Sequence, residues 1–196
     1  MKNVTDKKSP LAPDNFPDIP AVAGLTFASG KCQVKSANKN DVLIAELSPG
    51  TVAAGVFTKS KTAAAPVDWC RAILSEPEAR GLLVNSGNAN AFTGQIGAQT
   101  VEKMTSVAAS LIGCTSEQIY IAQTGVIGEQ VAVDRITGNL PQFYQKMGSN
   151  WKGAADAICT TDTYPKGAFR KVKLGDKIVT IAGIAKGSGM IAPNMA

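Results

Sequence analysis

Hydrophobic residues occur along the chain in short runs separated by turn-forming residues, a pattern typical of mixed strands and helices. The apolar runs predict four strands, at Val42–Leu47, Val52–Thr58, Gly81–Asn85 and Ile119–Gln123. Two later segments, Ala168–Leu174 and Lys177–Ile184, flank Gly175-Asp176 and therefore predict a β-hairpin. Within it, the basic run Arg170–Lys173 is expected to be a solvated strand face.

Apolar residues at helical spacing predict helices between these strands. The first begins at Pro66, because the fixed φ angle of proline suits the first helical turn. A long helix is expected to end near Ile112, followed by a turn or short helix at Cys114–Gln118. The next helix is expected to break or restart at Pro141, and the last predicted helix is Trp151–Ile158.

Together these elements predict an α/β or α+β fold in which strands end in polar loops, where sites commonly form. At 196 residues the chain is long enough for one domain or for a large piece of a bigger one. Residues 1–20 are expected to be an irregular N-terminal lead-in, since four prolines fall between Ser9 and Pro20. Residues 21–196 are expected to form the folded domain.

The chain contains no histidine, and this restricts its chemistry. Ser-His-Asp and Cys-His catalytic arrangements are excluded within it, as are histidine metal sites, and we expect no metal. A hydrolase or acyltransferase with this composition needs another base. The free α-amino group of an N-terminal Thr, Ser or Cys is one candidate, because it can activate the side chain of its own residue.

Charge and composition also limit the partners. The net charge of +5 comes from scattered basic residues without a nucleic-acid-binding motif, so we expect no nucleic acid partner but a mildly basic surface that favours carboxylate substrates. The apolar runs are too short to cross a bilayer and no secretory signal is visible, so we expect no membrane association. Four widely spaced cysteines are expected to be free thiols in a reducing cytoplasm: Cys32, Cys70, Cys114 and Cys159.

Thr124-Gly125 is the first candidate for chemistry. A predicted strand delivers Thr124 to what should be a tight turn, and Gly125 lets the backbone approach a ligand closely. The Thr124 hydroxyl and the Gly125 amide could both donate to one oxyanion, the arrangement that stabilises the tetrahedral intermediate of acyl transfer. The alternative is an ordinary Thr-Gly turn without a catalytic role.

Three further segments have both a structural and a functional interpretation. Cys159–Lys166 is rich in hydroxyl and carboxylate groups. We expect these groups mainly to cap a helix and form turns, and the alternative is that they form the polar wall of a pocket. Lys186 could hold a substrate carboxylate or be a surface lysine, and Lys186–Gly189 does not match a phosphate-binding loop. Asn85–Asn90 could be a loop shaped by its Asn and Gly residues or a loop that borders a site.

The C-terminal residues 186–196 are apolar and glycine-rich, and they carry no charge after Lys186. Chain ends usually fray into water unless they are tied down. An apolar end of this kind would normally be buried or continued by more chain. We therefore expect an end produced by cleavage of a longer polypeptide.

Taken together, several segments resemble the ornithine acetyltransferase family, the bifunctional glutamate and amino-acid N-acetyltransferases of arginine biosynthesis. They follow the family's order over most of the chain: Gly55–Thr58, Ala64–Val67, Val84–Asn90, Thr124–Gly128, Thr160–Thr163 with Pro165-Lys166, and Ala185–Pro193. Ser60, Phe92 and Cys159 depart from the residues common in the family, which leaves the shape of the pocket and the donor preference open.

The resemblance implies a precursor that cuts itself between an alanine and a threonine, with Ala196 at the cleavage site and this chain as the α chain. The threonine that opens the β chain would take the acetyl group of N-acetylornithine, release ornithine and pass the acetyl group to glutamate. No cofactor is implied, although acetyl-CoA could serve as a second donor. The mature enzyme would be a dimer of αβ units.

By the same resemblance, Thr124 and Gly125 form the oxyanion hole, while Thr160 and Lys186 contact the substrate. The implied fold is the layered α/β sandwich of ornithine acetyltransferases and self-processing aminopeptidases, completed by the β chain. Two alternatives remain open. One is an aminopeptidase of the same architecture, and the other is a non-catalytic binding module in which Thr124-Gly125 is a plain turn.

Overall fold

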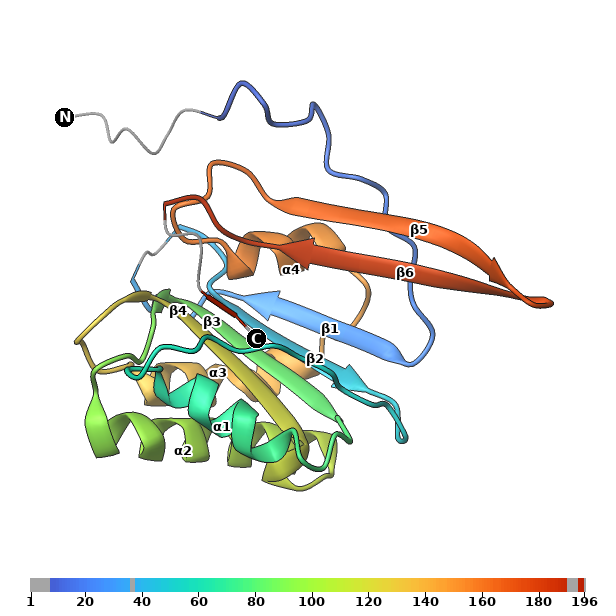
Figure 1. The fold of residues 1–196 in the computed structure, drawn as a ribbon. Helices are drawn as coiled ribbons and strands as arrows, with labels where there is room; N and C mark the ends of the chain where they lie inside the picture. Colours follow the sequence, from blue (N-terminus) through green and yellow to red (C-terminus); the bar gives the residue numbers. More distant parts are fainter. Residues whose placement is uncertain (1–7, 36–37, 190–193, 196) are drawn as a thin grey trace.

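The computed structural model describes residues 8–35, 38–189 and 194–195, which form two separate β-sheets (Figure 1). The larger sheet has four strands, in the order β1 (Leu25–Gly30), β2 (Val42–Leu47), β3 (Gly81–Asn88) and β4 (Ile119–Val126). The smaller sheet is a hairpin of β5 (Lys166–Leu174) and β6 (Lys177–Ala185). The tip of the hairpin projects beyond the larger sheet (Figure 1).

The direction of the strands decides which edge of the larger sheet collects polar residues. β1 and β2 are antiparallel, as are β2 and β3, whereas β3 and β4 run parallel. A parallel pair needs a crossover connection, which α2 (Gly94–Ile112) supplies. β3 and β4 therefore end at the same edge, with Asn88 and Val126 as their last residues.

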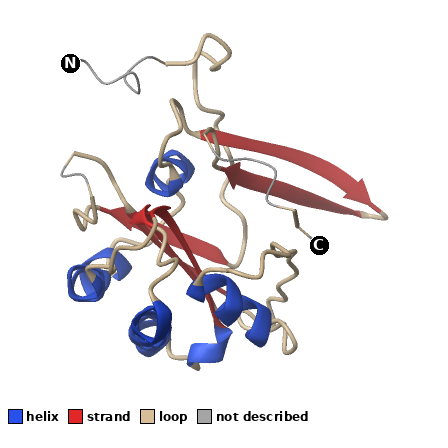
Figure 2. Ribbon diagram, turned by 60° about the vertical axis from the view of Figure 1, so that its left-hand side comes forward, coloured by secondary structure: helices blue, strands red, loops and turns tan. Residues whose placement is uncertain are grey.

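Three helices cover one face of the larger sheet and bury the first hydrophobic core (Figure 2). They are α1 (Ala65–Ile73), α2 and α3 (Val133–Tyr144). Leu83 of β3, Met104 of α2 and Leu140 of α3 are fully buried there. Burying one such side chain contributes about 1.5–3 kcal/mol, so this core is a major source of stability. No helix in the described part of the chain is both long and apolar enough to cross a bilayer.

α4 (Trp151–Ile158) lies on the opposite face, between the larger sheet and the hairpin. Ala154 and Ala157 are each 1% exposed, so their small side chains let the layers on both sides approach closely. Trp151 packs edge-on against Phe27 of β1, with 4.9 Å between the ring centroids. Side chains of β5 and β6 complete this second core, which fixes the base of the hairpin over the sheet.

Several predicted elements are confirmed, and with them the α/β class. β2 and α4 have the bounds expected from the sequence. Pro66 lies in the first turn of α1, and the hairpin turns at Gly175-Asp176. A short 3₁₀ helix occupies Ser116–Gln118, where the Gln118 side chain accepts the Thr115 N–H over 3.2 Å.

The N-terminal half contains two differences from the sequence prediction. Val52–Thr58 is not a strand, since it forms isolated bridges only, from Val52 to Glu78 and from Thr58 to Met195 in the described structure. Val56 is 59% exposed, and without a covered face the apolar residues of this segment do not build a ladder. β1 was not predicted, because its Ala, Ser and Gly residues are weak strand formers that pair only in the context of β2.

The other differences concern where elements end. β3 continues through Asn85–Asn88 and β4 through Thr124–Val126, so Thr124-Gly125 is an irregular strand end and not the tight turn that we predicted. Parallel pairing carries both segments on as strands, with shifts of register at Gly87 and Asn88. α3 continues through Pro141, because its buried face around Leu140 outweighs one missing backbone hydrogen bond.

Candidate active site

Thr124 and Lys186, which the sequence singled out separately, meet at the end of β4. Lys186 follows β6 directly, and its Nζ donates a hydrogen bond of 2.8 Å to Thr124 Oγ1. The two residues are 62 positions apart, so this contact depends on the fold and not on local structure. Because an ammonium group can only donate, the Thr124 hydroxyl keeps its own proton for another acceptor.

Gly125 has a backbone conformation that few other residues adopt. Its φ angle is +137°, a region that glycine alone occupies readily. A Cβ at this position would lie 2.3 Å from the carbonyl carbon of Gly87 and 2.6 Å from the backbone nitrogen of Asn88. Both are backbone atoms of β3, which cannot rotate aside. The glycine therefore lets the two strands stay close where the ladder becomes irregular.

Behind Thr124, buried amide side chains fix the ends of both strands. Gln123 Nε2 donates to Asn85 Oδ1 over 2.7 Å, and Asn90 Nδ2 donates to Gln123 Oε1 over 2.7 Å. Asn85 and Asn90 are at most 1% exposed. A buried polar group without a partner costs about 1–3 kcal/mol, so this paired network resists displacement. The segment Asn85–Asn90 thus braces the end of β4 from inside the protein.

Ser86 lies beside Thr124 and was not singled out from the sequence. The parallel register pairs the two residues, which places both on the same face of the sheet. Ser86 is fully buried, and its hydroxyl has no hydrogen-bond partner among the described residues. A serine within Asn-Ser-Gly-Asn is typical of a turn, so only the strand pairing reveals this position.

The turn after α4 carries Thr160, the other residue expected to contact substrate. Lys39 Nζ donates to the carbonyl oxygen of Cys159, in the peptide bond that precedes Thr160. The N–H of the same peptide bond, which belongs to Thr160, donates to Asp162 Oδ2 over 3.2 Å. Asp162 Oδ1 accepts the N–H of Gly187 over 2.7 Å. The structure therefore connects Thr160 to the end of β6 through Asp162.

Asp162 is a buried carboxylate with a charged partner. Its side chain is 0% exposed, and Oδ1 lies 2.6 Å from Lys166 Nζ. Burial alone would raise the pKa of Asp162, but hydrogen bonds from Lys166, Gly187 and Thr160 outweigh it and hold the pKa below its ordinary value. The carboxylate is therefore ionised at neutral pH. An Asp followed four positions later by a Lys is the sequence signal that could have drawn attention to it.

Ala196, the predicted cleavage residue, lies outside the described residues. Asn194 and Met195 are described, and they lie against residues 58–59. The Lys59 N–H donates to the Asn194 carbonyl over 2.9 Å, and Thr58 forms an isolated antiparallel bridge with Met195. The chain after Lys186 thus returns to the irregular segment that precedes α1.

A cavity of about 450 Å³ adjoins the Thr160 turn. Thr160 and Asp162 line it, together with Lys31 and Lys39 from the connection between β1 and β2. Its wall therefore combines hydroxyl groups with side chains of both charges, two lysines and two aspartates. This combination suits an amino-acid-like ligand, which carries both an ammonium and a carboxylate group.

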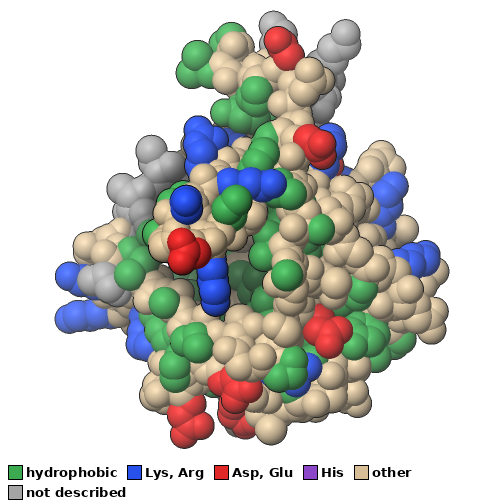
Figure 3. Space-filling model, turned by 90° about the vertical axis from the view of Figure 1, so that its right-hand side faces the viewer, with side chains coloured by type: hydrophobic (Ala, Val, Ile, Leu, Met, Phe, Trp, Pro, Cys, Tyr) green, Lys and Arg blue, Asp and Glu red, His purple; other side chains and the backbone are tan. Residues whose placement is uncertain are grey.

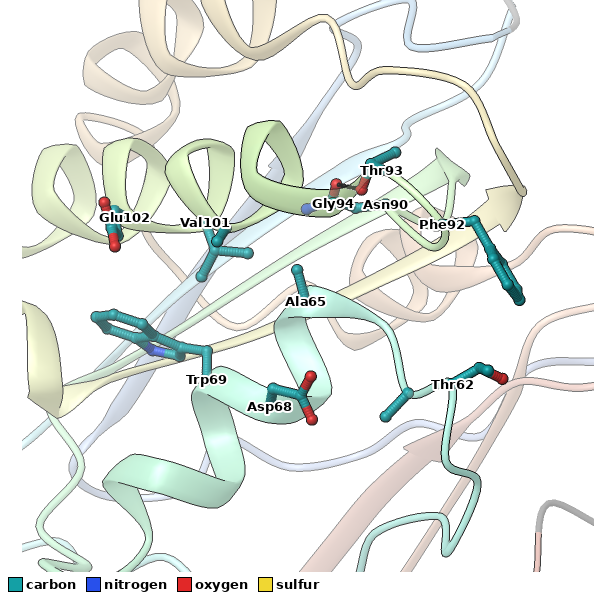
Figure 4. Close-up of a pocket in the computed structure, with 12 residues that line it drawn as sticks. Thr62, Ala65, Asp68, Trp69, Asn90, Phe92, Thr93, Gly94, Val101 and Glu102 are labelled. Atoms are coloured by element: carbon teal, nitrogen blue, oxygen red, sulfur yellow. Dashed lines mark hydrogen bonds between the residues drawn. The ribbon is translucent and has the colours of Figure 1, made fainter.

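A second cavity, of about 410 Å³, lies between α1 and the beginning of α2 (Figure 4). Trp69 and Val101 are its apolar residues at the helix interface, while Phe92 on the preceding loop is 72% exposed. The Asp68 carboxylate is already paired with Arg71 over 2.8 Å. Asn90, from the segment that could border a site, lines this cavity, but none of the four site residues predicted within the described chain does.

The four cysteines are free thiols, as predicted, and their environment disfavours ionisation. Burial, reinforced by the charge of Asp41, raises the pKa of Cys32 to about 12. Burial also raises the pKa of Cys70, Cys114 and Cys159. A protonated thiol is a weak nucleophile. Within the described residues, no group of three or more Cys, Asp or Glu side chains could hold a metal ion.

Comparison with known proteins places these features in one family. Residues 26–196 match the ArgJ family. The arginine biosynthesis bifunctional protein ArgJ of Bradyrhizobium diazoefficiens is 49% identical over 189 residues, and that of Nitrobacter winogradskyi is 48% identical over 193 residues. Each alignment covers 96% of this chain and 46% of the relative. The chain therefore spans about half the length of the curated relatives that it matches.

Two solved structures share the fold. The crystal structure of arginine biosynthesis bifunctional protein ArgJ from Bacillus halodurans has a TM-score of 0.82 at 32% identity, covering 89% of this chain and 92% of that chain. Ornithine acetyltransferase from Mycobacterium tuberculosis, complexed with ornithine, has a TM-score of 0.78 at 27% identity, covering 89% and 93%. These similarities confirm the predicted layered α/β sandwich.

Replacing Gly125 by alanine should destabilise the protein more than the same change at Gly128. Gly128 also has a positive φ, +82°, but a Cβ there would meet nothing within 4 Å. Gly128→Ala should therefore cost only about 1–2 kcal/mol for the backbone conformation. Gly125→Ala adds a clash with β3, and we expect the free energy of unfolding to fall by about 3 kcal/mol or more. Equal losses in urea unfolding would contradict this interpretation.

The lowered pKa of Asp162 predicts a pH-dependent contribution to stability. Because the pKa is lower in the folded state than its ordinary value of 3.8, the contribution is present above that value and is lost as the pH falls through the folded pKa. Asp162→Asn should therefore reduce the free energy of unfolding at neutral pH, and the difference from the unchanged protein should shrink below about pH 4. Urea unfolding measured across this range tests the prediction, and a constant difference would refute it.

Proposed function

The chain belongs to the ArgJ family, as its resemblance implied, and on this premise we propose that it forms part of an enzyme that transfers the acetyl group of N-acetylornithine to glutamate. The observation that carries the proposal is the hydrogen bond from Lys186 to Thr124 at the end of β4. The similar Mycobacterium tuberculosis protein is an ornithine acetyltransferase complexed with ornithine, which supports an amino acid as the substrate.

In the proposed reaction, Thr124 and Gly125 stabilise the oxyanion of the tetrahedral intermediate. The Thr124 hydroxyl donates its own proton to the oxyanion, because its oxygen already accepts from Lys186. The positive charge of Lys186 favours the same negative charge through this hydroxyl. Gly125 is exposed, so the acyl group can approach its amide, while the missing Cβ is what keeps β3 in close contact there.

Lys186 and Thr160 are proposed to bind the substrate around this point. Lys186 has three N–H donors, of which one is directed at Thr124, and within the described chain it has no ion-pair partner. The remaining donors can hold a substrate carboxylate. Thr160 lines the neighbouring cavity together with two lysines and two aspartates, and a hydroxyl beside both kinds of charge suits the polar end of an amino acid.

The nucleophile is proposed to be a threonine in the half of the family protein that this chain does not span. This chain has no histidine, and burial keeps its thiols protonated, so a base from elsewhere is required. By the family resemblance, that threonine begins a β chain after cleavage at Ala196, its own amine acts as base, and an acetyl-threonine intermediate forms. No resident cofactor is proposed. Acetyl-CoA as a second donor, a dimer of αβ units and a cytoplasmic location are further predictions of the resemblance.

The outer face of the hairpin is the surface that we propose the other half of the protein covers. Phe169 and Ala182 are cross-strand partners whose side chains pack into the second core. Successive side chains of a strand point to opposite faces, so the residues next to Phe169 and Ala182 in each strand point away from this core. This outer face is largely apolar, and Leu174 and Ile181 are 61% and 59% exposed there. Viewed toward the hairpin tip, hydrophobic side chains and side chains of both charges surround a hollow in the molecule (Figure 3). A two-stranded hairpin is only marginally stable alone, so this face requires cover.

Replacing Thr124 by alanine tests the oxyanion role. In the complete protein, with both halves, Thr124→Ala should reduce kcat for ornithine release by about 10²–10³, which corresponds to about 2.7–4 kcal/mol. Thr124→Ser keeps the hydroxyl and is the matched control, so it should retain most of the activity. The measurement is ornithine release from N-acetylornithine in the presence of glutamate. A peptide amide is assayed in parallel, because an aminopeptidase would prefer that substrate. An unchanged rate in Thr124→Ala would reject the role.

The hairpin proposal is tested by two isoleucines on opposite faces of β6. Ile181→Asp places a charge on the outer face, where burial against the other half should be strongly unfavourable. Ile178→Asp is the control, because Ile178 is 73% exposed but pairs with Lys173 on the opposite face. We expect the first substitution alone to reduce co-purification of the two halves. If both substitutions weaken the association equally, the outer face is not the interface.

A further inference from the structure

The buried carboxylate of Asp162 makes several hydrogen bonds to which the proposed function assigns no role. It lies in the turn between α4 and β5, and its side chain is 0% exposed. Its carboxylate accepts three hydrogen bonds: from Thr160 N over 3.2 Å, from Lys166 Nζ over 2.6 Å and from Gly187 N over 2.7 Å. Burying a carboxylate is costly unless several donors compensate it, and here they come from two segments distant in sequence.

Two of these donors belong to the backbone of the candidate site. One is the amide of Thr160 itself, and the other is the amide of Gly187, directly after Lys186. A single carboxylate therefore sets the separation between Thr160 and the end of β6. Because Lys186 in turn donates to Thr124, the same carboxylate also affects where β6 meets β4.

The bond to Gly187 distinguishes Asp162 from an ordinary turn residue. An aspartate that only shapes its own turn needs a local backbone partner, and the Thr160 N–H two positions away supplies it. The pair with Lys166, four positions away, is local as well. Gly187 is 25 positions away, and its bond contributes nothing to the turn. It connects the turn to the strand end that carries Lys186.

We propose that Asp162 is a positioning residue of the acetyl-transfer site, which holds Thr160 and Lys186 at a fixed separation around the substrate. The proposal rests on the function proposed above, and Asp162 itself does not touch the reacting atoms. The carboxylate is suited to this task because it offers only acceptors to its three donors. An asparagine would turn an amide nitrogen toward at least one of them, with no acceptor to receive it.

Asp134 provides a matched control outside the candidate site. It lies in the first turn of α3, and it also pairs with a lysine, Lys103, over 2.6 Å. Neither of the two cavities described above includes it among its lining residues. Asp134→Asn therefore removes the same charge and a similar ion pair without cutting the connection to β6.

The experiment compares Asp162→Asn with Asp134→Asn in the complete protein containing both halves. Mixing with N-acetylornithine should give a burst of ornithine, whose amplitude counts the folded sites and whose rate constant reports acylation. Small displacements of binding groups can cost about 100-fold in rate, so we expect Asp162→Asn to slow acylation by about 10- to 100-fold with the amplitude retained. Asp134→Asn should leave the rate constant near that of the unchanged protein.

A second variant covers the case in which Asp162→Asn folds poorly. Asp162→Glu keeps the charge and the pair with Lys166 but moves the oxygens outward by one methylene, so it should also slow acylation. Unchanged rate constants in both variants would overturn the proposal. So would a loss of burst amplitude at an unchanged rate constant, because that result indicates a purely structural role.

Hydrogen exchange separates this inference from the proposed function. Asp162→Asn should speed amide exchange in residues 160–163 and in residues 186–189, whereas Asp134→Asn should not. If the unchanged protein transfers no acetyl group, the proposed function fails, and the exchange result alone decides whether Asp162 holds the two segments together. Exchange that stays the same in both segments would refute the connection itself.

Discussion

The contact between Lys186 and Thr124 is the point on which the candidate site depends, because it joins the ends of two sheets that share no strand ladder in the described structure. A single exposed hydrogen bond contributes only about 0.5–1.5 kcal/mol, which is too little to hold two sheets in register. The contact therefore requires that both strand ends are already fixed by other interactions. The site is the result of that fixation and not its cause.

The two strand ends are held by different kinds of chemistry. Behind Thr124, neutral amides of Asn85, Asn90 and Gln123 satisfy one another inside the first core. Behind Lys186, the charged carboxylate of Asp162 gathers donors from its own turn and from the end of β6. Between the larger sheet and the hairpin, α4 contributes the buried alanines Ala154 and Ala157, whose small side chains keep the two sheets close. Precise placement at the surface thus depends on polar groups that are themselves buried.

The sequence predicted those parts of the fold whose signals are local. α4, β2 and the hairpin follow from periodicity and turn residues, and Thr124 and Lys186 were candidates from their sequence surroundings and from the family resemblance. The extension of β3 and β4 through Asn, Gly and Thr residues could not be predicted, because it depends on parallel pairing across α2. Asp162 was visible only as part of a hydroxyl-rich segment, since its decisive partner lies 25 positions away. Contacts between strands, helices and turns that are far apart in the sequence are therefore what this sequence alone did not predict.

The titrating groups of the chain lead to a further consequence for any acyl transfer at this site. The pKa of Asp162 is lowered and those of the four cysteines are raised, so all of these groups are moved away from neutrality. With no histidine in the chain, no side chain has an ordinary pKa near pH 7. General base catalysis is most efficient when the pKa of the base lies near the working pH. An α-amino group has an ordinary pKa of about 7.7–8.0, so the base proposed for the other half of the family protein would have a pKa in the range that no side chain of this chain supplies.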